Sequence, residues 1–322
     1  MANKFYFRKK NTNHFTVAFY NLENLFDTTD DPYTLDNDFL PDSEKRWNRK
    51  RYEKKIFKLG TAISNIGFSK TGKAPVLVGV AEVENKRVLE NLIDSKHLKN
   101  KNYGIVHYDS PDERGIDVGL LYQKEYFEVT HSENIPVLVD SQKGDRDYTR
   151  DILWVTGNLN KEEIHILVNH WPSRRDGAEL TSYKRVVAAE KNREIISRIT
   201  SHNADAKIII MGDFNDDPSS QSIKELVQND LFNPMERLLT RYSGSTNYRS
   251  QWNLFDQIIF SHNFHKYEKG KHCFSDASIF DDDFLKIYKG RYKGNPFRTY
   301  VGKKYTGGYS DHFPVYMRLQ LH

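Results

Sequence analysis

The chain has 322 residues, of which 38% are hydrophobic and 29% are charged, a composition typical of a globular protein with a polar surface. A net charge of +4 permits a polyanionic partner without requiring one. The single cysteine, Cys273, excludes an intrachain disulfide and a zinc finger.

No repeat or low-complexity linker divides the sequence, so we expect one domain over residues 1–322, and a monomer by default. No segment has membrane-spanning length, and residues 1–10 lack the apolar run of a signal peptide. We therefore expect no membrane anchor and a cytoplasmic location, or a secreted protein if a leader has been removed.

The first half of the chain alternates apolar runs with amphipathic stretches. Residues 14–21 predict a core strand that ends on Asn21, and residues 75–81 predict a buried strand that leads directly to Glu82. Between them, an acid-rich loop over residues 28–46 lacks EF-hand spacing, so we interpret it as solvated. The remaining elements expected here are helices over 47–67 and 86–98, and strands over 103–108, 117–122 and 127–139.

The second half predicts two antiparallel neighbours, over residues 152–159 and 164–169. Residues 252–261 predict a strand that carries Asp256. The other elements expected here are helices over 180–199 and 220–227 and a last strand over 315–319.

The stretch over residues 207–218 joins a buried strand to a cluster of polar side chains. It begins as a continuous apolar run, as expected for a strand covered on both faces, and it ends in a glycine turn. Because residues two apart on an extended path point the same way, Asp213 and Asn215 should face a common ligand. A plainer interpretation is a turn rich in Asp and Asn.

Several apolar strands, including this one, lead to polar side chains. These tips are Asn21, Glu82, His170, Asp213 with Asn215, and Asp311 with His312. The mixture of helices and strands predicts helical layers outside sheets. If the tips meet at one edge, they form a site of carboxylates, amides and histidines without a thiol, which suits Mg²⁺ or Mn²⁺.

Six short motifs in this order resemble the endonuclease/exonuclease/phosphatase superfamily, over about residues 14 to 320. They are Tyr20-Asn21-Leu22, Ala81-Glu82-Val83, Asn169-His170-Trp171, Gly212-Asp213-Phe214-Asn215, Phe255-Asp256-Gln257 and Ser310-Asp311-His312. The resemblance is nearer to the DNase and sphingomyelinase branch than to exonuclease III, which has Asp-x-Asn where this chain has Asn169-His170-Trp171.

That resemblance implies an α+β fold, a four-layer sandwich of two packed, mostly antiparallel sheets flanked by helices. It also implies metal-dependent hydrolysis of a phosphate ester by direct attack of water. Glu82 would be the principal metal ligand, with Asn21 helping to hold the ion and Asp311 on the metal side.

The same resemblance implies catalytic roles for five residues. Asp213 would orient and deprotonate the water, and Asn215 would bind a phosphate oxygen. His170 would donate a proton or hydrogen bond, while His312, oriented by Asp256, would act as a base or charge stabiliser. We expect nearby carboxylates to raise the pKa of both histidines.

The acidic partner of His170 is not determined by the sequence. Pancreatic DNase pairs its first catalytic histidine with a glutamate in the loop that corresponds to residues 108–113. Here that loop holds several acids, and the sequence does not choose among them as the partner of His170.

Two basic features predict contact with substrate. Arg114, Arg174 and Arg175 could bind phosphate oxygens, although exposed arginines are an equally good interpretation. Residues 284–309 interleave aromatic and basic side chains, a pattern that suits nucleic acid and especially single strands.

Nucleic acid is therefore the expected substrate, and three functions are weighed. The first is a Mg²⁺-dependent nuclease. The second is a phosphatase or phosphodiesterase for a lipid or sugar-phosphate headgroup, although no exposed apolar run indicates membrane action. The third is a catalytically inactive interaction module, which the intact set of catalytic residues disfavours.

Overall fold

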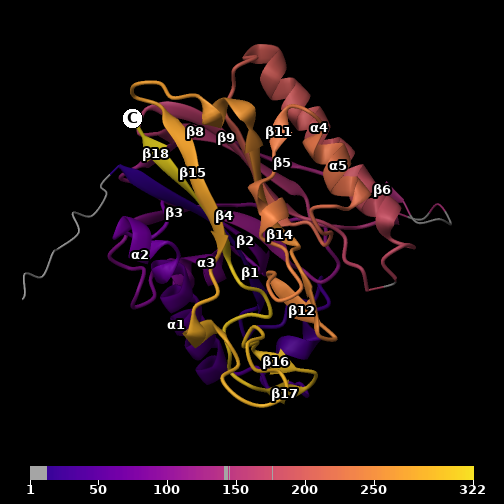
Figure 1. The fold of residues 1–322 in the computed structure, drawn as a ribbon. Helices are drawn as coiled ribbons and strands as arrows, with labels where there is room; N and C mark the ends of the chain where they lie inside the picture. The colour runs from indigo at the N-terminus through magenta and orange to yellow at the C-terminus, as the bar shows by residue number, and fades with distance from the viewer. Residues whose placement is uncertain (1–12, 141–143, 145, 176) are drawn as a thin grey trace, which may run out of the picture.

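Two six-stranded sheets lie at the centre of this computed structural model (Figure 1), which describes residues 13–140, 144, 146–175 and 177–322. The predicted absence of a signal peptide in residues 1–10 concerns a segment outside the described residues. No helix in the described ranges combines the length and apolarity needed to cross a membrane.

The first sheet has the strand order β15-β18-β1-β2-β4-β3. Within it β1 and β2 run parallel, and the other neighbouring pairs run antiparallel. The first long strand pairs with the last, from His14 opposite Gln320 to Phe19 opposite Val315. The strands are β1 (His14–Leu25), β2 (Leu77–Val83), β3 (Tyr103–His107), β4 (Asp117–Gln123), β15 (His272–Ile279) and β18 (Val315–Leu321).

The second sheet repeats this plan with the order β11-β14-β10-β9-β8-β5. Here β9 and β10 form the parallel pair, and the other neighbours run antiparallel, including the predicted β8–β9 pair. The strands are β5 (Phe127–Ile135), β8 (Ile152–Leu159), β9 (Glu162–His170), β10 (Ile208–Asp213), β11 (Leu231–Phe232) and β14 (Asp256–Ser261).

Helices cover the outer face of each sheet, with α1, α2 and α3 on one side of Figure 1 and α4 and α5 on the other. Ile56, Leu59 and Ile63 recur at helical spacing in α1 and join the core of the first sheet. Ala188 and Ile195 of α4 pack instead against the second sheet. The helices are α1 (Arg49–Asn65), α2 (Phe68–Thr71), α3 (Lys86–Ile93), α4 (Ser182–His202) and α5 (Gln221–Val227).

The prediction of a four-layer α+β sandwich with mostly antiparallel sheets is thus confirmed. Shorter elements lie in the connections. They are strands β6 (Val139–Asp140), β7 (Arg146–Asp147), β12 (Thr246–Tyr248), β13 (Gln251–Asn253), β16 (Tyr300–Val301) and β17 (Lys304–Tyr305), and 3-10 turns η1 (Asn37–Phe39), η2 (Pro234–Arg237), η3 (His262–His265) and η4 (Asp283–Leu285).

Two predicted boundaries were wrong for a local reason. The first strand continues past Asn21 to Leu25, because pairing with β2 resumes at Leu25 and Val83 after an irregular segment in which Glu23 and Asn24 adopt positive φ. The strand predicted over 252–261 is divided, so that Asp256 begins β14 instead of lying inside a longer strand.

Candidate active site

Polar side chains meet at one edge of the sandwich because both parallel pairs end there. Asn21 and Glu82 lie toward the carboxyl ends of β1 and β2, and His170 and Asp213 end β9 and β10. Antiparallel pairing places Asp256, the first residue of β14, directly opposite Asp213.

The amide of Asn21 joins the two sheets. Its Nδ2 donates to Oε1 of Glu82 at 3.3 Å and to Oδ2 of Asp213 at 3.0 Å. The backbone N–H of Asn24 donates to the other oxygen of Glu82 at 2.8 Å. A residue of the first sheet therefore holds two carboxylates, one from each sheet, around a single point.

Glu82 is aimed at this point by an irregularity in β2. The β2–β4 register shifts between Ala81 and Val83, and Glu82 has φ of 59°, in the left-handed region. Bulges redirect side chains at sheet ends, and a non-glycine residue in this region costs about 1–3 kcal/mol. The fold accepts this strain where it turns a carboxylate toward the site.

His312 is surrounded by acids. Its Nδ1 lies 2.6 Å from Oδ2 of the fully buried Asp256, and its Nε2 lies 4.0 Å from both Asp213 Oδ2 and Asp311 Oδ1. Burial acts to lower the pKa of His312, but Asp256, Asp213 and Asp311 together hold this pKa well above the ordinary value. The ring is therefore an imidazolium at neutral pH, as the sequence predicted.

His170 has the opposite surroundings. Its Nε2 lies 3.8 Å from Asp213 Oδ2, while its buried Nδ1 has no partner among the described residues. Burial, with the positive charges of Arg150, Arg114 and His312, holds the pKa of His170 well below the ordinary value. The prediction of a raised pKa was wrong for this histidine, which is neutral at pH 7.

Asp112, an acid of the 108–113 loop, pairs with an arginine and not with His170. Asp112 accepts a hydrogen bond from Arg150 Nη1 at 3.0 Å instead of contacting His170. The same guanidinium donates to the backbone oxygens of His170 at 3.2 Å and Trp171 at 2.7 Å. Arg150 was not identified from the sequence, because an arginine before a strand has no distinguishing pattern.

Asp213 is 2% exposed, and burial raises its pKa to about 6; His312 opposes this shift and Asp256 reinforces it. The backbone N–H of Asn215 donates to Asp213 Oδ1 at 3.0 Å. The Asn215 amide donates to Trp171 O at 2.9 Å, which uses one of its two hydrogens and leaves the other for a ligand.

The whole sequence was compared with models of known protein families. A model described as the endonuclease/exonuclease/phosphatase family matches residues 16–321. The chain belongs to this family.

Solved structures share the fold of this chain, and the first of those below is described as an endonuclease/exonuclease/phosphatase family protein. One from Bacteroides thetaiotaomicron is 17% identical, with a TM-score of 0.61 and coverage of 96% of this chain and 98% of the other. A humanized D. rerio TDP2 is 14% identical with a TM-score of 0.58, and the match covers 96% of this chain and 99% of the other. A B. thetaiotaomicron mannosyl-6-phosphatase is 17% identical with a TM-score of 0.59, and the match covers 95% of this chain and 99% of the other. Comparison with curated proteins finds no match.

Asp311, predicted on the metal side, lies beside an arginine. Arg298 Nη2 donates to its Oδ2 at 2.6 Å. Burial opposes ionisation, but His312, Arg298 and Lys55 lower the pKa of Asp311. Behind it, the buried ammonium of Lys55 lies 3.5 Å from Glu23 Oε2, a pair that the sequence did not reveal because Lys55 lies in a lysine-rich helix.

The donor set fits a hard divalent cation, as family membership implies. Carboxylate oxygens of Asp213 and Asp256 lie within 4.8 Å of one another, and Asp256 Oδ1 is buried without a hydrogen-bond partner among the described residues. The Glu82 and Asp213 carboxylates both accept hydrogen bonds from the Asn21 amide, and a bound cation would neutralise their negative charge.

The three predicted substrate arginines differ. Arg174 donates to Asp216 Oδ1 at 2.6 Å and to Asn215 O at 2.7 Å, so its guanidinium holds the loop after β10 instead of standing free for substrate. Arg114 bonds Asn24 Oδ1 beside the site, and Arg175 is exposed.

The 284–309 stretch is also divided in the structure. Tyr300 is buried and packs against Trp47, Tyr305 packs on Tyr300, and Phe284 packs on Tyr309. Exposed tyrosines remain at Tyr288 and Tyr292.

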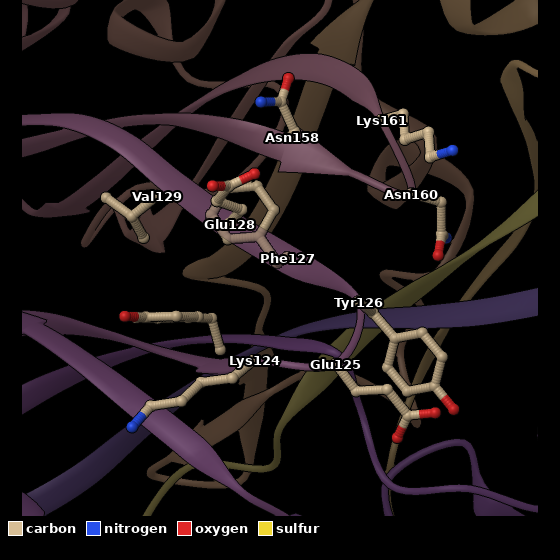
Figure 2. A pocket seen from close by; sticks show the side chains of 10 residues that line it. Lys124, Glu125, Tyr126, Phe127, Glu128, Val129, Asn158, Asn160 and Lys161 are labelled. Atoms are coloured by element: carbon tan, nitrogen blue, oxygen red, sulfur yellow. The ribbon is translucent and has the colours of Figure 1, made fainter.

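A hollow of about 830 Å³ lies beside the turn between β8 and β9, at the end of β9 opposite His170. Figure 2 shows side chains that line it. Lys124 and Lys161 line it together with Glu125 and Glu128, so its charges are mixed. The residues predicted to be catalytic instead lie at a polar edge, where several of them form hydrogen bonds with one another.

Proposed function

We propose that this protein is a divalent-metal-dependent phosphodiesterase that acts as a nuclease on DNA or RNA. One observation carries the proposal: Asp213 Oδ2 accepts from Asn21 at 3.0 Å and lies 3.8 Å from His170 Nε2 and 4.0 Å from His312 Nε2. A carboxylate that faces two imidazoles and an amide suits the attack of water on an anionic ester.

Each of these groups is in the state that its role requires. Asp213, with a pKa of about 6, is ionised at pH 7 and can accept a proton from water. The imidazolium of His312 can stabilise the negative charge that develops on the phosphoryl oxygens. Neutral His170 can donate a hydrogen bond to the phosphate.

The residues proposed to hold the cation are Glu82, Asn21 and Asp311. When bound, Mg²⁺ or Mn²⁺ would neutralise phosphate charge and stabilise the leaving group. Asn215 is proposed to bind a phosphate oxygen, and Asp256 to orient His312 through the 2.6 Å contact. Arg114 and Arg175 remain proposed substrate contacts.

The test is to incubate purified protein and Mg²⁺ or Mn²⁺ with plasmid DNA, single-stranded DNA, RNA and bis-p-nitrophenyl phosphate. We expect cleavage of a polymer that disappears with EDTA and in His312→Ala. No turnover of any substrate by protein shown to bind metal would contradict the proposal and favour an interaction module.

A sugar phosphate is the second candidate substrate, because the mannosyl-6-phosphatase shares the fold over 95% of this chain. Mannose 6-phosphate and a phospholipid headgroup ester therefore join the panel. Turnover of either compound without polymer cleavage would retain the hydrolase and reject the nuclease.

A further inference from the structure

Two loops near His312 carry exposed tyrosines, each beside a cation. Tyr242, Tyr248, Tyr288 and Tyr292 are 79%, 65%, 73% and 52% exposed. A cationic group lies 5.2–5.7 Å from the centre of each ring; these groups belong to Arg241, Arg249, Lys289 and Arg291. We name these four tyrosines the tyrosine face.

The first loop is fixed directly beside the site. Thr246 forms a backbone bridge with His312, and its Oγ1 donates to Asp311 O at 3.1 Å. The N–H of Phe313 donates to Ser245 O at 2.7 Å. The loop that carries Tyr242 and Tyr248 therefore adjoins the segment that positions the imidazolium.

The second loop is bonded to the first. Asn295 Nδ2 donates to Asn247 Oδ1 at 3.1 Å, which links the loop of Tyr288 and Tyr292 to the β12–β13 hairpin. Tyrosines about fifty positions apart in the sequence thus belong to one neighbourhood.

The charge of these loops is one-sided. Residues 241–250 and 287–295 contain no Asp or Glu. Across the described ranges, no ion pair engages the loops' five cations, whereas Lys286 pairs with Asp281 and Lys303 pairs with Glu44. The five cations are Arg241, Arg249, Lys289, Arg291 and Lys293.

We infer that the tyrosine face binds a single strand of nucleic acid and leads it to the catalytic edge, an inference that rests on the proposed nuclease function. Exposed rings can stack unpaired bases, and unpaired cations can contact the phosphates between them. A duplex keeps its bases stacked inside and offers no ring faces. Sequence preference should be weak, because stacking accepts every base.

The first experiment measures binding without turnover. Fluorescein-labelled oligothymidylate and oligouridylate of about 12 nucleotides, and a duplex of the same length, are titrated with protein in EDTA and followed by anisotropy. We expect single strands to bind more tightly than the duplex. We also expect log K to fall with log salt concentration by about 0.7 per phosphate contact.

Two double variants test the two loops separately, Tyr242→Ala/Tyr248→Ala and Tyr288→Ala/Tyr292→Ala. Each should weaken single-strand binding about tenfold or more. The matched control is Tyr33→Ala/Tyr267→Ala, which removes tyrosines that are 93% and 74% exposed and should leave affinity unchanged. Wild-type affinity in both loop variants, or tighter binding of the duplex, would overturn the inference.

Hydrolysis of bis-p-nitrophenyl phosphate separates the inference from the proposed function. This diester is not a polymer strand that the two loops could lead to the site, so its hydrolysis tests the catalytic edge separately. If wild type hydrolyses it but binds no oligonucleotide, the inference fails and the hydrolase stands. If the loop variants lose oligonucleotide binding while wild type cleaves nothing, the inference stands and the nuclease fails.

Discussion

The two histidines of the site come from different sheets, and one is charged while the other is neutral. His170 ends β9, and His312 lies just before β18, so each is delivered next to the central strands of its sheet. Both rings face the same oxygen of Asp213, at 3.8 and 4.0 Å. Strand position therefore explains where the rings are and leaves their protonation unexplained.

The difference comes from the groups behind the rings. A carboxylate of the opposite sheet, Asp256, contacts His312 and raises its pKa. Burial and the cation of Arg150 act on His170 instead, and they lower its pKa. A pair of identical side chains can thus supply one charged and one neutral donor to the same substrate.

Removing the charged member should have the largest effect. His312→Gln is expected to lower kcat by about 10²- to 10⁴-fold, because the variant cannot place a positive charge against the phosphoryl group. Steady-state kinetics on the best substrate of the panel would measure this. His131→Gln, at a half-exposed histidine on β5, is the control, and an equal loss there would refute the assignment.

Arg150→Met should be the most destabilising change. It removes the guanidinium that pairs with the buried Asp112, which keeps a hydrogen bond from the Arg114 backbone N–H, and should cost about 3–5 kcal/mol in the free energy of unfolding. Arg150→Met/Asp112→Leu should recover part of this loss. In either variant that folds, NMR titration should show the pKa of His170 rising toward the ordinary value, and an unchanged pKa would contradict the comparison.

Asp256→Asn should make the two histidines more alike. Without the carboxylate the pKa of His312 falls, so the imidazolium is lost at lower pH. The alkaline limb of the profile of kcat against pH therefore moves to lower pH. Each unit of this shift costs about tenfold in imidazolium at pH values above both pKa values.

The same variant has a signed effect on stability. A histidine whose folded pKa is raised stabilises the fold fully below its unfolded pKa, and this stabilisation is lost as pH rises through the folded pKa. The melting temperature of Asp256→Asn should therefore fall further below that of the wild type at about pH 5.5 than at alkaline pH. A deficit that grows with pH would oppose the assignment.

The smallest expected effects distinguish the two adjacent arginines. Arg174→Ala removes the bonds to Asp216 and Asn215 O and should cost about 1–3 kcal/mol of stability. Arg175→Ala should leave the melting temperature unchanged and raise KM only a few-fold. Equal melting temperatures for both variants would contradict the structural role of Arg174.

Strand ends were predictable from sequence because continuous apolar runs stop sharply at polar residues. This was sufficient to place Asn21, Glu82, His170 and Asp213 at one edge once the sheets pair. Helical coverage followed equally from apolar spacing in α1 and α4.

Pairings between distant side chains were not predictable. Arg150 meets Asp112 38 positions away, and Lys55 meets Thr299 244 positions away, and no local pattern marks either contact. The register shift that turns Glu82 also depends on β4, a strand formed more than thirty residues later. Protonation of His170 depends on such contacts, which explains why its predicted pKa was wrong.

The pairing of β1 with β18 affects how the protein is made. During synthesis β1 emerges long before β18, so the β1 edge that pairs with β18 stays open until Val315–Leu321 have been made. His312 lies just before β18 and arrives with it. A nascent chain that ends before residue 312 therefore lacks both this pairing and the imidazole that faces Asp213.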